Sequence, residues 1–430
     1  MNRVPRRLML LQLLCVCGSS VASADNWPQF RGPTGQGVAA DTPVPTRWSE
    51  QQGIRWKTAV PGKGHSSPVI WGEQIWMSTA SADGRQLGAI CMDRGSGKVL
   101  REIPIFSPGH VEEIHDDNSY ASPTPVLAEG RAYFDFGTYG AACVDTESGE
   151  LLWRNTELAI DHQGGPGSSP VLFGETLLIH RDGADAQYVA ALDVNNGRIR
   201  WKRARSAPYR DNPITHRAFA TPLLYEHGGR TLLISPAADQ CHAYDAATGE
   251  ELWHVRYVGF SNVPCPVAVG DRVYICTGFF QPLLLCVRLG GRGDVTETHV
   301  EWEYKAQIPE VSSPIAVDGR IYFASSKGVL TCLDAATGER KKTLRLGGNY
   351  SASPLAAGGL LYFCSREGFT KVVRPGDDSE VLETNKLNGH IHASPVALDG
   401  VLYVRTETHL YCIANDDAAP SAASSRPASN

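Results

Sequence analysis

The chain has 430 residues and a formal net charge of −6 at pH 7, with 40 basic and 46 acidic side chains. This mildly acidic charge follows no pattern along the chain, which argues against a nucleic-acid partner. No linker-like stretch divides the sequence between its two terminal segments, so we expect one large domain.

The first 24 residues are expected to be a secretory signal peptide. Three arginines precede an apolar core at residues 8–17, and residues 22–24 (Ala-Ser-Ala) form a cleavage site. The apolar core is too short to span a bilayer, so we expect no transmembrane segment. Removing the peptide changes the net charge to −9, with 37 basic and 46 acidic residues. We expect export to the periplasm or cell envelope, and a lipid anchor at Cys17 is disfavoured because no small residue precedes it.

A short apolar stretch led by proline recurs eight times, at intervals of 40 to 57 residues. A repeat of this length accommodates four short strands and is the sequence signature of a β-propeller. The predicted fold class is therefore all-β, an eight-bladed propeller of four-stranded blades over residues 54–415. The eight prolines are Pro68, Pro125, Pro170, Pro222, Pro266, Pro314, Pro354 and Pro395.

A tight acidic turn follows several of these stretches, with Asp and Gly four residues apart. Asp can bond to its own backbone and Gly tolerates positive φ, so this pair suits a short connection between strands. In three of these turns a Trp stands eight residues after the Asp, where it can wedge between neighbouring blades. The residues predicted to be structural are Asp145, Gly149, Asp193, Gly197, Asp245, Gly249, Asp334 and Gly338 in the turns, and Trp56, Trp153, Trp201 and Trp253 on outer strands.

The last repeat supplies only three strands before an Ala-, Ser- and Pro-rich tail, residues 416–430, which we expect to be disordered. Residues 54–58 match the outer strand of another repeat, including its Trp and Lys. We therefore expect this N-terminal strand to complete the last blade and close the ring, which protects the blade edges. Residues 25–53 are predicted to form an arm that covers part of the ring, with Trp27 and Phe30 docked into it.

Eleven cysteines in an exported chain would usually indicate disulfides, and two of them lie in the signal peptide. Several of the other nine share a register in different repeats. Their Cα atoms are then expected to lie beyond the roughly 7 Å limit for a disulfide. We interpret them as small buried apolar side chains, with no regular disulfide framework.

The loops that join one blade to the next are expected to meet at one rim of the channel, and they are rich in polar residues. Functional residues favour such loops. Lys63, His110, Tyr120, Asp161, Gln163 and His390 lie in these loops. The candidate ligand-binding residues of the rim are His65, His115, Asp116, Asp117, Asn118, His162, His216, Arg217, Asn262, Glu310, Asn349, Tyr350 and His392.

Three interpretations of this rim stay open. The first is that polar side chains line a water-filled channel mouth. The second is a site for a polar ligand, a partner or a hard cation, built on Asp116, Asp117, Glu310 and Asn349. The third is a transition-metal site built on His65, His162, His216 and His392. No local spacing supplies two zinc ligands and no Ser/His/Asp arrangement is evident, so we assign no metal ligand and no catalytic residue.

The residues from Asp245 to Trp253 (DAATGEELW) and the Ser-Ser-Pro starts resemble the PQQ-type propeller repeat. Residues 27–33 (WPQFRGP) and 118–125 (NSYASPTP) resemble a secreted bacterial subgroup of PQQ-like propeller proteins. The resemblance extends over roughly residues 27–414. The same repeat occurs in quinoprotein alcohol dehydrogenases and in the propeller lipoprotein that scaffolds the outer-membrane β-barrel assembly machinery.

This resemblance implies two alternative functions. Quinoprotein dehydrogenases place a disulfide of adjacent cysteines against the quinone, and this chain has no adjacent pair after the signal peptide. We therefore expect an exported, monomeric, ligand-binding or protein-scaffolding module of the bacterial cell envelope, with envelope proteins or a small polar ligand as partners. The alternative is an oxidoreductase that acts on alcohols or sugars, for which the resemblance implies PQQ and Ca²⁺ as cofactors.

Overall fold

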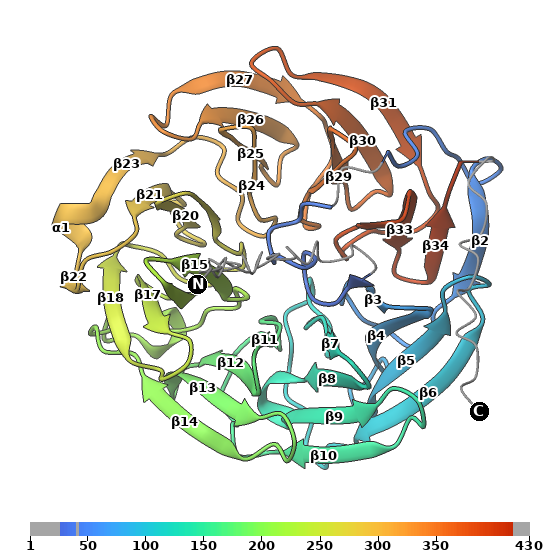
Figure 1. Cartoon of the computed structure of the whole chain (residues 1–430), viewed down its shortest axis with the longest axis horizontal. Coiled ribbons are helices and arrows are strands. Elements are labelled where there is room, and N and C mark those ends of the chain that lie inside the picture. Colours follow the sequence, from blue (N-terminus) through green and yellow to red (C-terminus); the bar gives the residue numbers. More distant parts are fainter. Residues whose placement is uncertain (1–25, 40–42, 416–430) are drawn as a thin grey trace, which may run out of the picture.

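The computed structural model describes residues 26–39 and 43–415, which form a ring of eight antiparallel blades around a central channel (Figure 1). The expected signal peptide and C-terminal tail lie outside the described residues. In each blade the first strand lies beside the channel and is only three to five residues long, while later strands are longer. This arrangement confirms the predicted eight-bladed all-β propeller.

The strands of the first four blades follow in chain order from the channel outward. Blade 1 comprises β3 (Val69–Trp71), β4 (Gln74–Ala80), β5 (Leu87–Asp93) and β6 (Val99–Phe106), and blade 2 comprises β7 (Val126–Ala128), β8 (Arg131–Asp135), β9 (Ala141–Asp145) and β10 (Leu151–Asn155). Blade 3 comprises β11 (Val171–Phe173), β12 (Thr176–Asp182), β13 (Gln187–Asp193) and β14 (Ile199–Ala204), and blade 4 comprises β15 (Leu223–His227), β16 (Arg230–Ala237), β17 (Gln240–Asp245) and β18 (Glu251–Arg256).

The other four blades repeat this pattern, and the last one takes its outer strand from the N-terminal part of the chain. Blade 5 comprises β19 (Val267–Val269), β20 (Arg272–Cys276), β21 (Leu284–Arg288) and β23 (Val300–Tyr304), and blade 6 comprises β24 (Ile315–Val317), β25 (Arg320–Ala324), β26 (Val329–Asp334) and β27 (Arg340–Arg345). Blade 7 comprises β28 (Leu355–Ala357), β29 (Leu360–Cys364), β30 (Phe369–Arg374) and β31 (Glu380–Lys386), and blade 8 comprises β32 (Val396–Leu398), β33 (Val401–Arg405), β34 (His409–Ile413) and β2 (Ile54–Ala59).

Two further strands and three short helices complete the described elements. β1 (Asn26–Trp27) is added to the inner edge of blade 1, and β22 (Gly293–Asp294) pairs in parallel with β18 at the outer edge of blade 4. The helices are η1 (Gly137–Tyr139), η2 (Pro213–Thr215) and α1 (Thr296–His299). Within residues 26–39 and 43–415, no helix has the length and apolar character needed to cross a bilayer.

The ring closes through β2, which pairs antiparallel with β34. Ile54 lies opposite Ile413, and Trp56 lies opposite Cys412. The first strand of the ring and the last are therefore neighbours in one sheet, as residues 54–58 predict from their sequence pattern.

A belt of blade-to-blade hydrogen bonds surrounds the channel at the residue before each anchoring proline. At seven steps the backbone N–H of this residue donates to the side-chain oxygen of its counterpart in the next blade, at 2.9–3.1 Å. We call these residues the hydroxyl belt: Ser67, Thr124, Ser169, Thr221, Ser313, Ser353 and Ser394, with Cys265 at the eighth position. All of them are buried, so each bond satisfies a backbone donor that water cannot reach.

Cys265 is the one belt member without a hydroxyl. Burial raises the pKa of its thiol, although Arg31 and hydrogen bonds with Ser313 and Thr221 act in the opposite direction. The thiol therefore stays protonated at neutral pH and serves as a weak member of the belt. All nine described cysteines are buried and free, which agrees with the expected absence of a disulfide framework.

The outer strands interlock through the predicted Trp and Gly residues. The indole of Trp153 donates to Val194 O at 2.8 Å, in the turn of the next blade. Gly197 in that turn has φ +70, and a Cβ there would approach the Trp153 ring to 2.5 Å. Trp56 and Trp201 lie in the same way against Gly97 and Gly249. Each of these glycines is required both by its backbone conformation and by the indole that lies on it.

Trp253 departs from this pattern because blade 5 has no equivalent turn. The connection from β21 to β23 instead carries β22 and α1, and Trp253 pairs with Gly293 of β22. The insertion covers this indole, which is 1% exposed. Trp302, which was not assigned from the sequence, takes the interlocking role one blade later against Gly338.

The N-terminal arm runs across the centre of the ring (Figure 1). Trp27 pairs with Ile70 of blade 1, and Pro28 O accepts from Leu127 N of blade 2. Further along, Gln36 Oε1 accepts from Ala268 N of blade 5 at 2.7 Å, and Val38 forms a bridge to Ala356 of blade 7. These partners follow the anchoring prolines, whereas the loops precede them, so the arm and the loops lie on opposite faces.

Replacing Ser353 with Ala tests the hydroxyl belt. The change leaves the buried N–H of Ser313 without its acceptor and should lower the free energy of unfolding by about 1–3 kcal/mol. Ser353→Thr keeps the acceptor and should cost less, since Thr already stands at two belt positions. Urea unfolding followed by circular dichroism measures both. If both variants lower the free energy of unfolding equally, packing of the Ser353 side chain and not its hydrogen bond stabilises this position.

Candidate functional site

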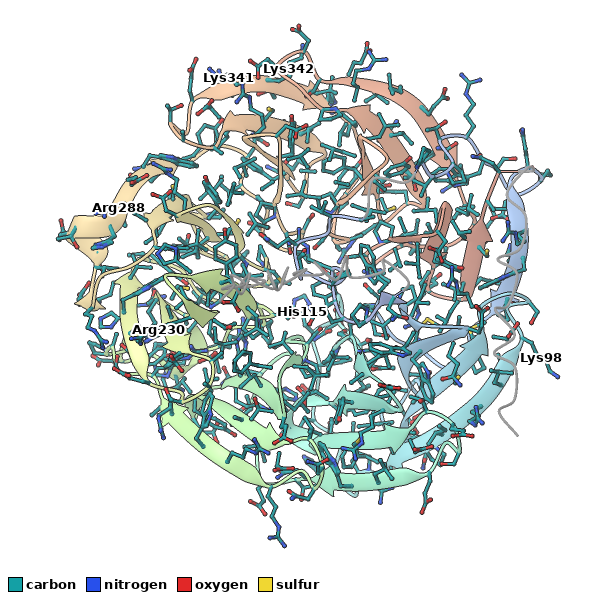
Figure 2. All side chains as sticks on the ribbon, viewed as in Figure 1. Lys98, His115, Arg230, Arg288, Lys341 and Lys342 are labelled. Carbon is teal, nitrogen blue, oxygen red and sulfur yellow. The ribbon has the colours of Figure 1, made fainter. Side chains whose placement is uncertain are left out.

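The hydroxyl belt, the arm and the loops together enclose a central cavity of about 410 Å³. Phe30 of the arm forms part of its wall from one side, and the belt residues form the middle layer. The loop side carries the polar and aromatic residues of the rim, including half-exposed Phe279. In Figure 2, His115 lies near the centre of the ring, whereas Lys98, Arg288, Lys341 and Lys342 lie at its periphery. The cavity is therefore a pocket that the arm closes at one end.

Two stacked histidines form one wall of this cavity. The rings of His65 and His392 lie 4.2 Å apart between centroids and are inclined by only 8°. Burial lowers the pKa of His65 to about 3, with further lowering by His392, Arg405 and Arg366. Burial and then Arg366 lower the pKa of His392 to about 4. Both rings are neutral at pH 7, so each presents one nitrogen donor and one acceptor.

Arg366 and Asp117 form an ion pair beside these rings. Arg366 lies in the turn between β29 and β30, where its Nε donates to Ser351 Oγ at 2.6 Å and its Nη1 donates to Asp117 Oδ1 at 2.9 Å. Burial alone would raise the pKa of Asp117, but the Arg366 guanidinium outweighs this effect and the pKa is lowered. The pair joins the loop after blade 1 to blade 7 across the cavity mouth.

Arg217 lies between blades 3 and 4, and its hydrogen-bond partners are neutral. Its Nε donates to Ser261 Oγ at 2.8 Å and its Nη1 donates to Gln163 O at 3.0 Å. The guanidinium also lies 5.8 Å from the centroid of Phe260. Burial lowers the pKa of Arg217, yet arginine stays charged at neutral pH. Within the described part of the chain, no carboxylate lies within ion-pair distance of this cation.

Eight of the polar loop residues singled out from the sequence line the cavity: His65, His115, Asp117, Asn118, Gln163, Arg217, Glu310 and His392. The role of Asn118 is mainly structural, because its Nδ2 donates to Gly164 O at 2.7 Å and to Pro166 O at 3.1 Å. Asp117 and Glu310 are the two carboxylates of the lining, and Arg217 and Arg366 are its two arginines.

The other six predicted ligand-binding residues lie outside the lining of this cavity. Asn262 is buried and donates to Tyr257 Oη and Cys276 O, and Tyr350 is buried in the core between blades 6 and 7. The Nε2 atom of His216 forms a hydrogen bond of 2.6 Å with Arg210 O. Asn349 binds Glu367 through its backbone N–H. Asp116 is exposed, and His162 lines a separate cavity.

The proposed four-histidine metal site is therefore not assembled. His65 and His392 stack on one another, while His162 and His216 are held in other surroundings. His162 Nδ1 accepts from Gly165 N at 3.1 Å and so fixes the glycine-rich loop that follows it. Each of these rings is oriented by its own neighbours, so the four side chains do not point towards a common centre.

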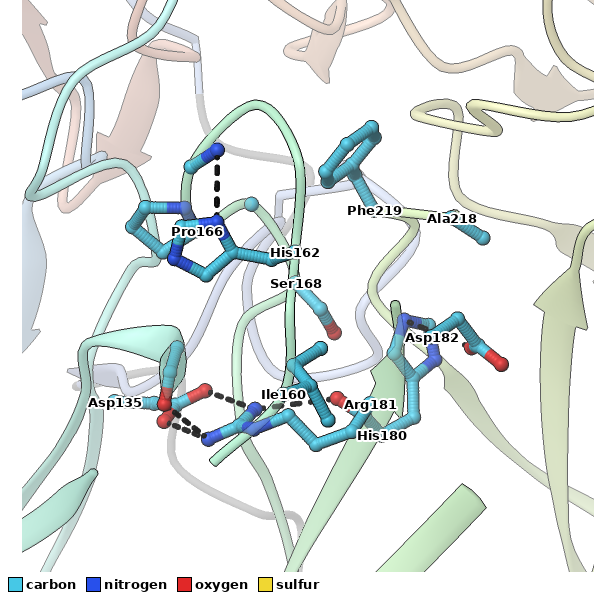
Figure 3. A pocket seen from close by; sticks show the side chains of 13 residues that line it. Asp135, Ile160, His162, Pro166, Ser168, His180, Arg181, Asp182, Ala218 and Phe219 are labelled. Atoms are coloured by element: carbon cyan, nitrogen blue, oxygen red, sulfur yellow. Dashed lines mark hydrogen bonds and ion pairs between the residues drawn. The ribbon is translucent and has the colours of Figure 1, made fainter. Parts of the chain in front are cut away.

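The separate cavity beside His162 holds about 20 Å³, which is room for one water molecule (Figure 3). A buried ion pair joins Arg181 to Asp135 at 2.5 Å, and a second joins Arg205 to Asp182 at 2.7 Å. Removing one partner of such a pair leaves an uncompensated buried charge. The first pair joins blade 2 to blade 3, and Arg205, which follows the outer strand of blade 3, also donates to Ser235 O of blade 4 at 3.2 Å. The cavity itself is too small for a ligand.

Several cavity residues were missed from the sequence. The belt hydroxyls carry a visible signal, because Ser, Thr or Cys precedes all eight anchoring prolines. Arg366 lies within a blade, in the turn Ser365–Gly368, whereas the predicted site residues lie in loops between blades. Phe219 and Phe279 also line the cavity, and nothing in the repeat pattern distinguishes them from core aromatic residues.

Comparison with known proteins gives a family match over most of the chain. The family model described as outer membrane protein assembly factor BamB matches residues 45–203 and 217–420. Tetrathionate hydrolase from Acidithiobacillus ferrooxidans is 24% identical over 260 residues, which cover 52% of this chain and 48% of that protein. The chain thus spans about half the length of this curated relative.

Solved structures share the fold at low sequence identity. BamB from Moraxella catarrhalis superposes with a TM-score of 0.58 at 15% identity, covering 84% of this chain and 99% of that one. A europium-containing methanol dehydrogenase gives 0.66 at 10% identity, with 92% and 99% coverage. Quinohemoprotein alcohol dehydrogenase from Comamonas testosteroni gives 0.64 at 11% identity, with 94% and 83% coverage. At these identities the likeness concerns the fold.

The stacked histidines predict a pH dependence of stability. Their folded pKa values, about 3 and about 4, lie below the ordinary value of 6.5, so the unfolded chain takes up protons at higher pH than the folded chain. Their contribution to the free energy of unfolding is therefore fully present above pH 6.5 and is lost as pH falls towards their folded pKa values. His392→Gln removes one titrating ring, so this free energy should change less steeply with pH in urea titrations. Slopes identical to wild type across this window would contradict the assignment.

Proposed function

Because the chain belongs to the family of the outer membrane protein assembly factor BamB, we propose that it is an exported binding module of the bacterial cell envelope. Its ligand is a small oxyanion that enters the central cavity. Two features support the envelope location: the family, and the signal-like sequence of residues 1–24. The loop side of the cavity is the binding face, since the arm occupies the other end.

Arg217 is the observation that carries the ligand assignment. Its guanidinium lines the cavity and is partly desolvated, yet it contacts only neutral acceptors and an aromatic ring. A cation taken out of water in this way gains most from a ligand that brings its own negative charge. Guanidinium groups bind carboxylate, phosphate and similar oxyanions through paired hydrogen bonds.

The belt adds neutral hydrogen-bond donors to this site. Each of the seven belt hydroxyls accepts one backbone N–H from the neighbouring blade, and this bond does not involve the hydroxyl's own hydrogen, which can act as a donor. One such hydrogen is used inside the belt, where Ser353 Oγ donates to Ser313 Oγ at 2.9 Å. The others line a cavity of about 410 Å³, which is in the size range of small-ligand pockets.

The curated relative supports the same ligand class. Its name says that it hydrolyses tetrathionate, which is an elongated sulfur oxyanion. Because the match covers only about half of that protein, we carry over the charge of the ligand and not the hydrolysis. Sulfur oxyanions, phosphate and small carboxylates share the chemistry that Arg217 recognises.

The quinoprotein alternative has less support from the cavity residues. Ca²⁺ prefers about six to eight oxygen ligands, with carboxylates among them. Of the two lining carboxylates, Asp117 is already paired with Arg366, and the Asn118 side-chain oxygen accepts from Ser119 N and Ser122 Oγ. Glu310 then remains as the principal anionic ligand, so the residues present do not fit a PQQ–Ca²⁺ site.

Replacing Arg217 with Gln tests the proposed site. Loss of one charge-assisted contact, worth about 1.5–3 kcal/mol, should weaken oxyanion binding by roughly tenfold to a hundredfold. Calorimetry with tetrathionate, thiosulfate, phosphate and succinate gives the affinities, and PQQ with Ca²⁺ is tested alongside them. Arg345→Gln removes the same charge from the exposed outer strand β27 and should leave binding unchanged.

Two outcomes would contradict the proposal. One is the failure of every oxyanion to bind wild-type protein at about 10 mM, which would saturate a site with a Kd of about 1 mM. The other is binding that Arg217→Gln and Arg345→Gln weaken equally. Either result would favour protein scaffolding. Immobilising the chain and identifying the envelope proteins that it captures would then test that function.

A further inference from the structure

A second group of titratable residues lies at the outer side of blade 4, away from the central cavity. His242 on β17 and His254 on β18 are directly paired across the two strands, so both side chains project from the same face of the sheet. A register shift at Trp253 brings Glu251 towards the same face. The donor atoms of the three residues all lie within 4.8 Å of one another.

The hydrogen bonds of His242 determine which of its nitrogens carries the proton. Gln240 Nε2 donates to Ala207 O, which orients the amide so that its Oε1 faces His242 Nε2 at 2.7 Å. Since Oε1 can only accept, His242 Nε2 carries the hydrogen. In the neutral ring Nδ1 is then an unprotonated lone pair.

This lone pair faces a carboxylate with no hydrogen between them. His242 is fully buried, and its Nδ1 has no hydrogen-bond partner although Glu251 Oε2 lies 3.2 Å away. Two electron-rich atoms at this distance repel unless a cation lies between them.

We propose that this cluster binds one Zn²⁺ ion, with His242 Nδ1, His254 Nδ1 and the Glu251 carboxylate as ligands. Two imidazoles and a carboxylate are a typical ligand set for zinc. Metal–ligand bonds of about 2.0–2.1 Å in a tetrahedron place neighbouring ligand atoms roughly 3.3 Å apart. The two oxygens of the Glu251 carboxylate each face one ring: Oε2 lies 3.2 Å from His242 Nδ1 and Oε1 lies 2.8 Å from His254 Nδ1, and both separations are close to this value.

Two neighbouring groups complete the site. Asp294 Oδ2 lies 3.9 Å from His254 Nε2, beyond hydrogen-bond length, and its negative charge favours a hydrogen on Nε2, which leaves Nδ1 for the metal. Exposed Ser206 donates to Glu251 Oε1 at 2.7 Å, so this side of the cluster is open to a water molecule as fourth ligand.

The position of the cluster indicates what the metal does. Asp294 belongs to β22, part of the insertion from blade 5 that returns to the outer edge of blade 4 (Figure 1). A zinc ion bound to His254 therefore strengthens the junction between this insertion and β18. The site is structural, and it is independent of ligand binding in the central cavity.

Zinc analysis of the purified full chain tests the inference. After chelator treatment and dialysis against Zn²⁺, wild-type protein should retain one zinc per chain, and Co²⁺ in its place should give the visible absorption of a tetrahedral site. His254→Gln removes a ligand from a partly exposed position and should abolish both signals. Asp294→Asn removes the nearby negative charge and should weaken binding less than the loss of a ligand does. His227→Gln, a histidine change on β15 of the same blade, should retain the metal.

Melting curves without metal identify any variant that fails to fold, and Asp294→Asn provides a second, exposed test if His254→Gln is unfolded. Wild-type protein that retains no zinc after dialysis would overturn the inference. Zinc retention by folded His254→Gln equal to wild type would overturn it as well.

Discussion

The hydroxyl belt is the interaction on which the geometry of the channel depends. Each blade is an antiparallel sheet with its own internal hydrogen bonds, and nothing in that pairing specifies how far apart neighbouring inner strands lie. The belt supplies this distance, because a backbone donor of one blade must reach a hydroxyl of the next. The proline that follows has no N–H and cannot make this bond, so the residue before it supplies the donor.

The same belt gives the cavity its chemistry. Hydroxyls that accept from the backbone remain donors towards the channel, and the arm blocks one end, so the space becomes a pocket instead of a pore. The aspartate, glutamate and arginine side chains that line the pocket all lie on its loop side. There Arg366 is neutralised by Asp117, whereas Arg217 has only neutral partners, so the two arginines differ in their capacity for an added anion.

The repeat pattern made the fold predictable, since Pro, Asp, Gly and Trp each mark a position whose backbone or packing requirement is local. The approximate location of the site also followed, because loops between blades must end beside the channel. What each loop residue does could not be predicted. Asn262 and His216 have suitable chemistry, but nearby carbonyl and hydroxyl oxygens bind their side chains. Arg366 reaches the cavity from blade 7 because of a tertiary ion pair with Asp117, which no local pattern encodes.

Joining β2 to β34 has a consequence for the order of folding. The earliest strand of the ring has no partner until the last residues of the chain are present, and the arm likewise needs blades 1, 2, 5 and 7 before it can settle. Bringing such distant segments together makes closure a late and slow event. An incomplete ring would expose unpaired blade edges, which attract other chains, so these edges need protection until the final strand has paired.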